Sequence, residues 1–335
     1  MHRLLATALL AAPLAAHAWG PDGHQAVATI AAGLIKGSPA EARVAGLLGD
    51  MSLPLASIWA DCVKGISPSQ HYTYPAPGKY PACAPLETPA RIAEMADYVK
   101  RNDRQCAIGA DEDSCHKQTH YADIALQRRR YQPGVTGARP DDVVGALRAA
   151  ILVLQGKPSP GQPSFKSPRE ALLVLVHLVG DVHQPLHVGG IYLDAQGRRV
   201  DPDKQGFDRG SFTVGGNSLV FAAADTPGAK NFHAYWDNVP DVLKPEHVDG
   251  NWLAEARQVL PDAGGPQDWP ARWGSQSLEL AAVAHQGLGF SARQGGNWVV
   301  SLPEGYGAKA DEIKRTQLTR AGARLARVLK AVFLN

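Results

Sequence analysis

The chain has 335 residues, of which 44% are hydrophobic, 34 are glycine and 25 are proline. This composition supports one large or two modest hydrophobic cores and excludes an intrinsically disordered chain. The 34 basic residues nearly balance the 32 acidic ones, so the net charge of +2 predicts neither a nucleic-acid nor a membrane partner. The twelve histidines are more informative, because several of them stand at a fixed spacing from an aspartate.

The first eighteen residues have the pattern of a secretory signal. Arg3 precedes a short apolar stretch that ends in Ala16-His17-Ala18, and cleavage after Ala18 would leave a mature chain that begins at Trp19. A buried N-terminal helix is the alternative interpretation. Because the apolar stretch is too short to span a membrane, we expect a secreted or periplasmic protein without a membrane anchor.

The mature chain, residues 19–335, is predicted to be a single, mainly α-helical domain. Apolar residues recur at helical spacing in five segments, at residues 24–34, 89–100, 142–154, 170–182 and 311–334. The segment 170–182 is apolar nearly all round, which indicates a buried helix. Its start has a complete signal, because Ser167, Pro168 and Glu170 provide an N-cap, a first-turn proline and a capping-box glutamate.

Strand signals are scarce and the loops are rich in proline. Strict alternation is best at residues 189–200 and 211–221, which we expect to form a small β-hairpin around a Gly- and Asp-rich loop. The proline-rich stretches 75–89 and 156–168 are predicted to be surface loops within the one domain.

Export would permit disulfide bonds between the four cysteines. Three pairings are possible, and we favour Cys62–Cys83 and Cys106–Cys115 because both close short loops. A cysteine zinc site is the alternative, but the chain contains no C-x-x-C pair.

The segment HLVGDVHQPLH, residues 177–187, carries the strongest chemical signal. His177 and Asp181 stand four residues apart on the same helix face, so both can bind one metal ion. His187 follows a proline and can turn back toward the same cavity, whereas His183 points off the shared face and is interpreted as structural. Burying Asp181 in an apolar helix is costly without a partner or a cation.

A second H-x-x-x-D pair, His233 and Asp237, lies in the segment NFHAYWD. Any single histidine in an apolar chain is more often a hydrogen-bonded core residue than a metal ligand. Two such pairs and one further histidine in the same chain favour a metal site.

Five motifs together resemble the trinuclear-zinc nucleases, the secreted single-strand-specific nucleases and 3′-nucleotidases typified by fungal nucleases P-one and S-one. They are WGPDGH (19–24), WAD (59–61), HLVGDVHQPLH (177–187), GGNS (215–218) and NFHAYWD (231–237). They occur in the family's order, while the C-terminal third matches only by its helical character. The resemblance implies the mainly helical fold of the phospholipase C and nuclease P-one type.

The resemblance implies three zinc ions per chain, bound by nitrogen and oxygen ligands. The first zinc ion would be bound by Asp61, His120, His177 and Asp181. The second would be bound by the α-amino group and main-chain carbonyl of Trp19, by His24, and by Asp181 as a bridging carboxylate. The third would be bound by His187, His233 and Asp237.

The assignment of His120 involves a choice, because His71 also precedes a tyrosine. In the family this histidine is followed three residues later by an aspartate, which only His120 has, in Asp123. The separation between His120 and His177 along the sequence also fits the family layout. The choice places an insertion near residues 65–115, longer than the connection usual in the family, and a second one lies at residues 191–210.

The same resemblance implies the reaction and the residues that serve it. Asp123 would orient the attacking water and take its proton, and Lys64 would contact the phosphate where relatives usually have arginine. Tyr121 would stack on a base, with a core tyrosine as the alternative, and Asn217 of the GGN motif would contact substrate. We therefore expect hydrolysis of single-stranded DNA, RNA or 3′-nucleotides to 5′-phosphate products, by a monomer that needs no protein partner.

Two other functions are compatible with these motifs. A zinc-dependent phospholipase C shares the fold and a similar metal cluster, but its early histidine usually lies farther from the N-terminal tryptophan, and glutamate takes the place of Asp237. The Trp19-x4-His24 spacing and Asp237 itself therefore favour the nuclease. A non-catalytic zinc-binding protein of the same fold is the second alternative.

Overall fold

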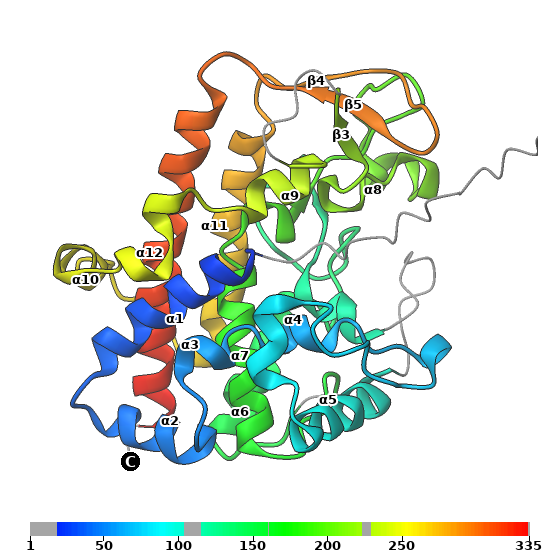
Figure 1. Ribbon diagram of the computed structural model, residues 1–335. Helices are drawn as coiled ribbons and strands as arrows, with labels where there is room; N and C mark the ends of the chain where they lie inside the picture. The colour runs from blue at the N-terminus through cyan, green and yellow to red at the C-terminus, as the bar shows by residue number, and fades with distance from the viewer. Residues whose placement is uncertain (1–18, 104–114, 160, 223–228, 334–335) are drawn as a thin grey trace, which may run out of the picture.

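A computed structural model describes residues 19–103, 115–159, 161–222 and 229–333, so the predicted signal at residues 1–18 lies outside the described residues. Helices dominate this part of the chain (Figure 1). The α-helices are α1 (Pro21–Ile35), α2 (Pro39–Leu48), α3 (Leu53–Ala56), α4 (Trp59–Val63), α5 (Pro89–Asn102), α6 (Val143–Leu154), α7 (Pro168–Asp181), α8 (Pro202–Gln205), α9 (Phe232–Asp237), α10 (Gly250–Arg257), α11 (Trp269–Ala284) and α12 (Tyr306–Val332). The prediction of a mainly helical domain is confirmed.

Helix α7 lies at the centre of the main hydrophobic core, packed against α6, α12, α1 and α4. Every residue from Glu170 to Asp181 is buried, as its nearly continuous apolar sequence predicts. The N-cap also forms as predicted, because the side chain of Ser167 accepts a hydrogen bond from the Glu170 amide. The Glu170 carboxylate reaches back to the amide of Lys166, one residue beyond the capping-box position.

The first and last helices of the described chain are packed together. Helix α1 crosses α12, and the crossing is close because Gly322 has no side chain (Figure 1). A β-carbon at Gly322 would lie 2.5 Å from the β-carbon of Ile30. Helix α12 thereby holds α1 against the core, and α1 carries His24.

The strands are short and pair differently from the predicted hairpin. They are β1 (Ile124–Ala125), β2 (Gly189–Gly190), β3 (Leu219–Phe221), β4 (Gly289–Phe290) and β5 (Trp298–Ser301). The segments 189–200 and 211–221 meet each other at one isolated antiparallel bridge, Tyr192 with Phe212, while β3 pairs in parallel with β5. The predicted pairing is therefore wrong for most of its length, because alternation indicates a strand without specifying its partner.

The parallel pair β1 and β2 positions the candidate site. Ile124 pairs with Gly189 and Ala125 with Gly190, and the Ala122 amide donates to the His187 carbonyl at 2.8 Å. This pairing brings the chain after His120 against the chain after His187. Two motifs far apart in the sequence therefore meet at one place.

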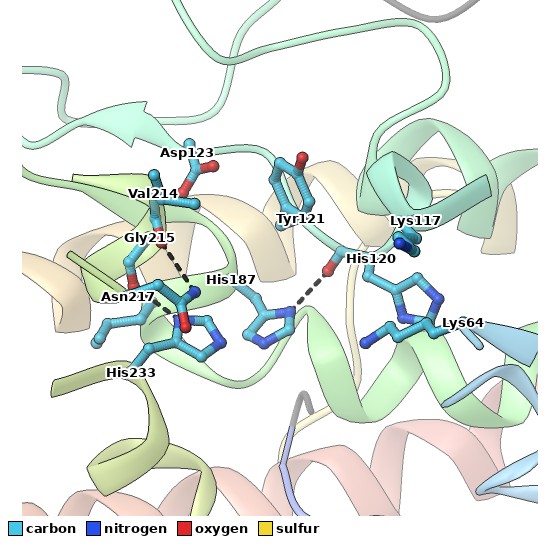
Figure 2. Close-up of a pocket in the computed structure, with 11 residues that line it drawn as sticks. Lys64, Lys117, His120, Tyr121, Asp123, His187, Val214, Gly215, Asn217 and His233 are labelled. Atoms are coloured by element: carbon cyan, nitrogen blue, oxygen red, sulfur yellow. Dashed lines mark hydrogen bonds between the residues drawn. The ribbon is translucent and has the colours of Figure 1, made fainter. Parts of the chain in front are cut away.

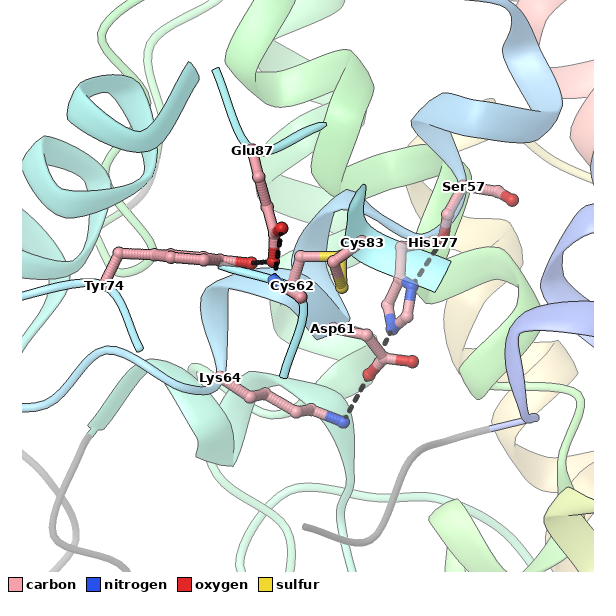
Figure 3. Close-up of a disulfide and its surroundings, with 9 residues drawn as sticks. Ser57, Asp61, Cys62, Lys64, Tyr74, Cys83, Glu87 and His177 are labelled. Carbon is pink, nitrogen blue, oxygen red and sulfur yellow. Dashed lines mark hydrogen bonds and ion pairs between the residues drawn. A yellow bond between two sulfur atoms is a disulfide. The ribbon is translucent and has the colours of Figure 1, made fainter. Parts of the chain in front are cut away.

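One of the two predicted disulfides is confirmed, and it stands beside a candidate ligand. Cys62, the residue directly after Asp61, forms a disulfide with Cys83 (Figure 3). This bond ties α4 to the 3-10 helix at Pro81–Leu86. The second predicted pair includes Cys106, which lies outside the described residues. No helix in the described part of the chain combines the length and hydrophobicity needed to cross a membrane.

Candidate metal centre

The structure gathers three buried groups of histidine and aspartate whose potential ligand atoms lie within 4.8 Å of one another. We number these groups as the first, second and third clusters. The first cluster is Asp61, His120 and His177; the second cluster is His24, His177 and Asp181; the third cluster is His187, His233 and Asp237. Every member was selected from the sequence as a candidate ligand, and each of the three clusters could hold a metal ion.

Asp181 and His177 join the first and second clusters. One carboxylate oxygen of Asp181 lies 2.8 Å from Nδ1 of His120 and 3.2 Å from Nε2 of His177. The other oxygen lies 3.3 Å from Nε2 of His24. Asp61 completes the group, with its carboxylate 3.6 Å from Nε2 of His177. A single carboxylate thus faces both clusters, which is the arrangement that a bridging ligand requires.

The third cluster is formed by α9 and the 3-10 helix at Pro185–His187. His233 and Asp237 stand one turn apart on α9, with Nε2 of His233 3.3 Å from the carboxylate of Asp237. The ring of His187 lies 4.9 Å from that of His233 between centroids. The amide of Gln184 donates to the other oxygen of Asp237 at 2.7 Å, which fixes the orientation of that carboxylate.

Main-chain carbonyls orient three of the histidines by accepting a hydrogen bond from Nδ1 at 2.7 Å. The pairs are His177 with Ser57, His187 with His120, and His233 with Gly215. Each bond orients the ring so that Nδ1 faces the carbonyl and Nε2 faces the carboxylates of its cluster. Proteins orient metal-binding histidines by hydrogen bonds of this type.

Burial controls the protonation of these histidines. It lowers the pKa of His24, with a further contribution from His177, and the pKa of His233, each to about 4. Neutral imidazoles are the form that binds a divalent cation. His177 differs, because Asp181 and Asp61 outweigh burial and raise its pKa. The carboxylates of Asp181 and Asp61 therefore stabilise positive charge beside them, as they would stabilise a bound cation.

The pKa values of Asp181 and Asp237 are shifted in opposite directions. Burial opposes ionisation of Asp181, but His177 and His120 hold the pKa of its carboxyl well below the usual range. Burial raises the pKa of Asp237 to about 7, although His187 and Gln184 oppose this shift. A buried carboxylate of this kind needs a nearby positive charge to remain ionised at neutral pH.

The residues present fit divalent metal ions. Three ligand atoms, His187 Nε2, Asp181 Oδ1 and Asp237 Oδ2, are buried and have no hydrogen-bond partner within the part of the chain that the structure describes. Leaving such atoms unpaired is costly, and metal coordination would remove that cost. Imidazole nitrogens and carboxylate oxygens without a thiolate are a donor set typical of zinc sites.

A pocket opens above the first and third clusters (Figure 2). Its lining includes two lysines, candidate ligands from both clusters and part of the GGN motif, namely Lys64, Lys117, His120, Tyr121, Asp123, Leu186, His187, Val214, Gly215, Asn217 and His233. Lys64 is 8% exposed, and its ammonium group lies 2.8 Å from the carboxylate of Asp61. All four substrate-contacting or catalytic residues expected from the sequence therefore line one pocket: Asp123, Lys64, Tyr121 and Asn217.

The backbone of the pocket is strained at two facing positions. Asp123 and Val214 have φ values of 56° and 54°, in the left-handed region that non-glycine residues avoid. For a β-branched residue such as Val214 this conformation is a true outlier, and strain of this kind concentrates at functional sites. Asp123 lies toward the third cluster, because a β-carbon at Gly215 would be 3.0 Å from its Oδ1.

Tyr121 and Asn217 occupy the walls of the pocket. The guanidinium of Arg139 lies 5.1 Å from the centre of the Tyr121 ring and donates to the main-chain carbonyl of Gln118 at 2.5 Å. Arg139 thereby braces the segment that carries His120. The Asn217 side chain donates to the Val214 carbonyl at 2.9 Å, which holds the GGN turn closed.

Two histidines lie outside the clusters, as the sequence interpretation expects. His183 is buried behind α7, where its Nδ1 donates to the Val179 carbonyl and its Nε2 lies 2.8 Å from Arg324. His71 is exposed at the end of a short 3-10 helix, and the structure places His120 instead in the first cluster.

Sequence reasoning missed three contributors to the site. Gln184 orients Asp237, Lys117 lines the pocket, and Val214 carries the strained backbone before the GGN motif. Gln184 lies within the motif at residues 177–187 and Val214 directly precedes the GGNS motif, so the position of both was a usable signal. Lys117 stands three residues before His120 with no motif of its own.

The start of the predicted mature chain is hydrogen-bonded to the backbone of two helices of the site. Trp19 is fully buried, and its indole donates to the carbonyl of Gly180, next to Asp181. The amide of Gly20 donates to the carbonyl of Asp237 at 2.8 Å. The start of the mature chain is thereby tied to α7 and α9, which carry members of the second and third clusters.

Two comparisons relate this chain to known proteins. Residues 19–334 match the sequence profile of the S1/P1 Nuclease family. The chain is also similar to Endonuclease 1 of Arabidopsis thaliana, with 22% identity over 333 residues that cover 98% of this chain and 92% of that protein.

Proposed function

The chain belongs to the S1/P1 nuclease family, and from that premise we propose that it is a zinc-dependent phosphodiesterase of single-stranded nucleic acid. Its substrates are single-stranded DNA or RNA, which it cleaves to products with 5′-phosphates, and 3′-nucleotides. The observation that carries the proposal is the convergence of three buried His/Asp clusters, one joined to the next by Asp181, beneath a pocket with two lysines.

Zinc is the metal proposed for all three clusters. When bound, it would neutralise charge on the phosphate and lower the pKa of the attacking water toward neutrality. His120 and Asp61 serve the first ion with His177, and Asp181 is proposed to bridge it to the ion held by His24. The third ion is proposed to be held by His187, His233 and Asp237.

Asp123 is proposed as the group that orients the attacking water and accepts its proton. Support comes from its position in the pocket wall, where its side chain is 4% exposed, and from its strained backbone. Tyr192 holds that backbone by donating from its hydroxyl to the Asp123 carbonyl at 2.8 Å. Asp123→Asn should lower kcat by about 100-fold or more with little change in zinc content, as loss of a general base does.

Three further residues are proposed to bind substrate. Lys64 contacts the phosphate with a single charge, so its contact is weaker than the two-point contact of arginine. Tyr121 stacks on a base, which every base permits, and so favours unpaired strands with little sequence preference. Asn217 contacts the nucleotide from the opposite wall of the pocket.

The α-amino group of Trp19 is proposed as a ligand of the second ion, available after removal of residues 1–18 during export. The proposal thus includes secretion or release into the periplasm, with which the Cys62–Cys83 disulfide is consistent. We propose a monomer that needs no other protein for activity.

The proposal is tested on mature protein that begins at Trp19. Zinc is counted by mass spectrometry, and hydrolysis is measured on denatured DNA, RNA and a 3′-nucleotide, with analysis of the product ends. Three zinc ions, single-strand cleavage and 5′-phosphate ends are expected. Turnover of phosphatidylcholine without turnover of nucleic acid would replace this function with that of a phospholipase, and zinc binding without any esterase activity would indicate a non-catalytic protein.

A further inference from the structure

Helix α9 is too short to hold its two candidate ligands in place by itself. It has 6 residues and carries His233 and Asp237 of the third cluster. Isolated helices shorter than about 12 residues are only marginally stable in water, because the first turn is costly to form. The geometry of the third cluster therefore depends on the contacts that α9 makes with the rest of the protein.

The two ends of α9 are stabilised by different means. At its start, the side chain of Asn231 accepts a hydrogen bond from the Ala234 amide at 2.8 Å, as an N-cap does. Many helices end in a glycine with left-handed backbone, which satisfies the last carbonyl groups. Asn238, which follows α9, is instead extended, with φ −72° and ψ 127°. Its amide donates to the Ala234 carbonyl, and the later carbonyl groups need other partners.

A lysine of the last helix provides partners for this end of α9. The ammonium group of Lys314, on α12, donates to the carbonyl of Tyr235 at 2.8 Å and to that of Asn238 at 2.6 Å. The Gly20 amide donates to the carbonyl of Asp237, which stands between them in the sequence. A cation at the C-terminus of a helix also interacts favourably with the helix dipole. Lys314 thus closes the end of the helix where Asp237 stands.

Lys314 is buried, which is unusual for a lysine. It is 3% exposed, and its ammonium nitrogen lies 4.7 Å from the centre of the Tyr235 ring and 5.9 Å from that of Trp236. Its carboxylate partner Asp311 is 4.0 Å away and half exposed. Burying a lysine costs free energy unless other groups stabilise its charge. Here most of the stabilising groups belong to α9 or follow it directly.

Lys314 is one of three buried residues that α12 presents to α9. Tyr306, Ala310 and Lys314 are spaced four residues apart, so they share one face of α12. The hydroxyl of Tyr306 accepts a hydrogen bond from the indole of Trp236 on α9 at 3.0 Å. Helix α12 therefore holds α9 at two points, although the three clusters contain no residue of α12.

We propose that Lys314 is a positioning residue for the third metal ion. The inference rests on the proposed function, in which His187, His233 and Asp237 hold that ion. Lys314 fixes the backbone from which His233 and Asp237 extend. Without its ammonium group the last turn of α9 loses its closure, Asp237 no longer keeps its place beside His233, and the third ion binds more weakly. The first and second clusters contain no residue of α9, so they keep their ions.

Zinc binding by a Lys314→Met variant of the mature protein tests this role. Methionine keeps most of the apolar stem of lysine and cannot donate to the two carbonyls. Zinc content is measured by mass spectrometry over a series of free zinc concentrations set by a chelator. Lys314→Met should bind two ions normally and the third about tenfold or more weakly, as loss of charge-assisted hydrogen bonds predicts. Lys314→Arg, which keeps the charge and the donors, should restore the third ion.

The matched control is Lys309→Met, which removes an exposed lysine from the same helix and should leave the affinity for all three ions unchanged. If Lys314→Met does not fold, Lys314→Gln, which keeps a donor and loses the charge, is compared with this control in the same way. A protein that binds three zinc ions and hydrolyses no phosphate ester would overturn the proposed function and leave the role of Lys314 intact.

Two further measurements identify which ion depends on Lys314. His233→Ala removes a member of the third cluster directly, so adding Lys314→Met to it should release no further zinc. Hydrogen exchange followed by mass spectrometry should show faster exchange of the α9 amides in Lys314→Met, with unchanged protection of α7. Neither measurement depends on activity.

Two results would overturn the positioning role. The first is a Lys314→Met protein that binds all three zinc ions as tightly as the Lys309→Met control does. The second is a further loss of zinc when Lys314→Met is added to His233→Ala, which would show that Lys314 supports the whole fold and not the third cluster.

Discussion

A β-carbon on Gly180 would lie 2.6 Å from Nδ1 of His24, so the imidazole of His24 packs directly against the backbone of α7. The same ring stacks on His177 with 3.8 Å between centroids. Glycine within a helix costs about 1 kcal/mol relative to alanine. Here it permits the close approach of α1 to α7 that brings His24 within reach of Asp181.

Gly180→Ala should therefore displace His24 and remove the second metal ion. We expect a loss of about 1–3 kcal/mol in the free energy of unfolding, as overpacking of a core causes, and a zinc content lower by one per chain. The control is Gly46→Ala on α2, where no atom lies within 4 Å of the added carbon. That change should stabilise the protein by roughly 0.5–1 kcal/mol with normal zinc content. Equal zinc content in both variants would contradict the packing role of Gly180.

Asp181→Asn should nearly abolish activity and lower the zinc content, because one carboxylate faces both the first and second clusters. The substitution keeps the size of the side chain and removes its charge, so two cations would lose their shared anion. Zinc analysis and single-strand hydrolysis measure the effect. A folded Asp181→Asn protein with near-normal turnover would exclude the bridging role.

The choice between His120 and His71 is decided by a pair of alanine variants. His120→Ala should lose metal and activity, because His120 contacts Asp181 and its carbonyl orients His187. His71→Ala should change neither property, since His71 is exposed. Loss of metal and activity in His71→Ala but not in His120→Ala would show that His71 is the ligand. The insertion near residues 65–115 would then follow this histidine and not precede it.

His183 stands between two candidate ligands in the sequence, yet its substitution should affect stability and not metal binding. His183→Ala removes one of the partners of the buried Arg324 guanidinium, which also contacts Gln276 and Asp262, at a cost of about 1–3 kcal/mol in the free energy of unfolding. Zinc content should stay normal. His187→Ala is the comparison, with loss of one zinc ion expected. Zinc loss in the His183 variant without any change in thermal stability would be the unexpected outcome.

Retaining one residue before Trp19 should weaken the second metal site. A free α-amino group has a pKa of about 7.7–8.0 and binds zinc once deprotonated, whereas a peptide nitrogen is a poor ligand. The extended protein should bind one zinc ion less tightly and hydrolyse single-stranded DNA far more slowly. Equal zinc content and equal rates for the extended and authentic proteins would rule out a ligand role for Trp19.

The sequence predicted the parts of the site that depend on local spacing. The i,i+4 relation placed His177 and Asp181 on one helix face, and their side chains lie 3.2 Å apart in the structure. The sequence pattern could not predict the β1–β2 pairing that brings His120 to His187, because strands of two residues leave no periodic pattern. The left-handed backbone of Val214 was equally hidden, since valine normally avoids that conformation.

The predicted pairing of residues 189–200 with residues 211–221 was wrong for a related reason. Alternation in residues 211–221 indicated a strand, and β3 does form there, but its partner is β5, nearly eighty residues later in the chain. Partner choice depends on which apolar surfaces meet in the folded protein, and that information is distributed over the whole sequence.

The close crossing of α1 and α12 at Ile30 and Gly322 makes the position of His24 depend on a distant part of the chain. The helix that carries His24 is completed early in synthesis, but its packing partner is among the last segments made. Contacts between such distant parts of a chain form late in folding. A chain truncated before α12 would leave the helix that carries His24 without this support. A chain whose synthesis stops before α12 should therefore lack a complete second cluster, whatever metal the mature protein binds.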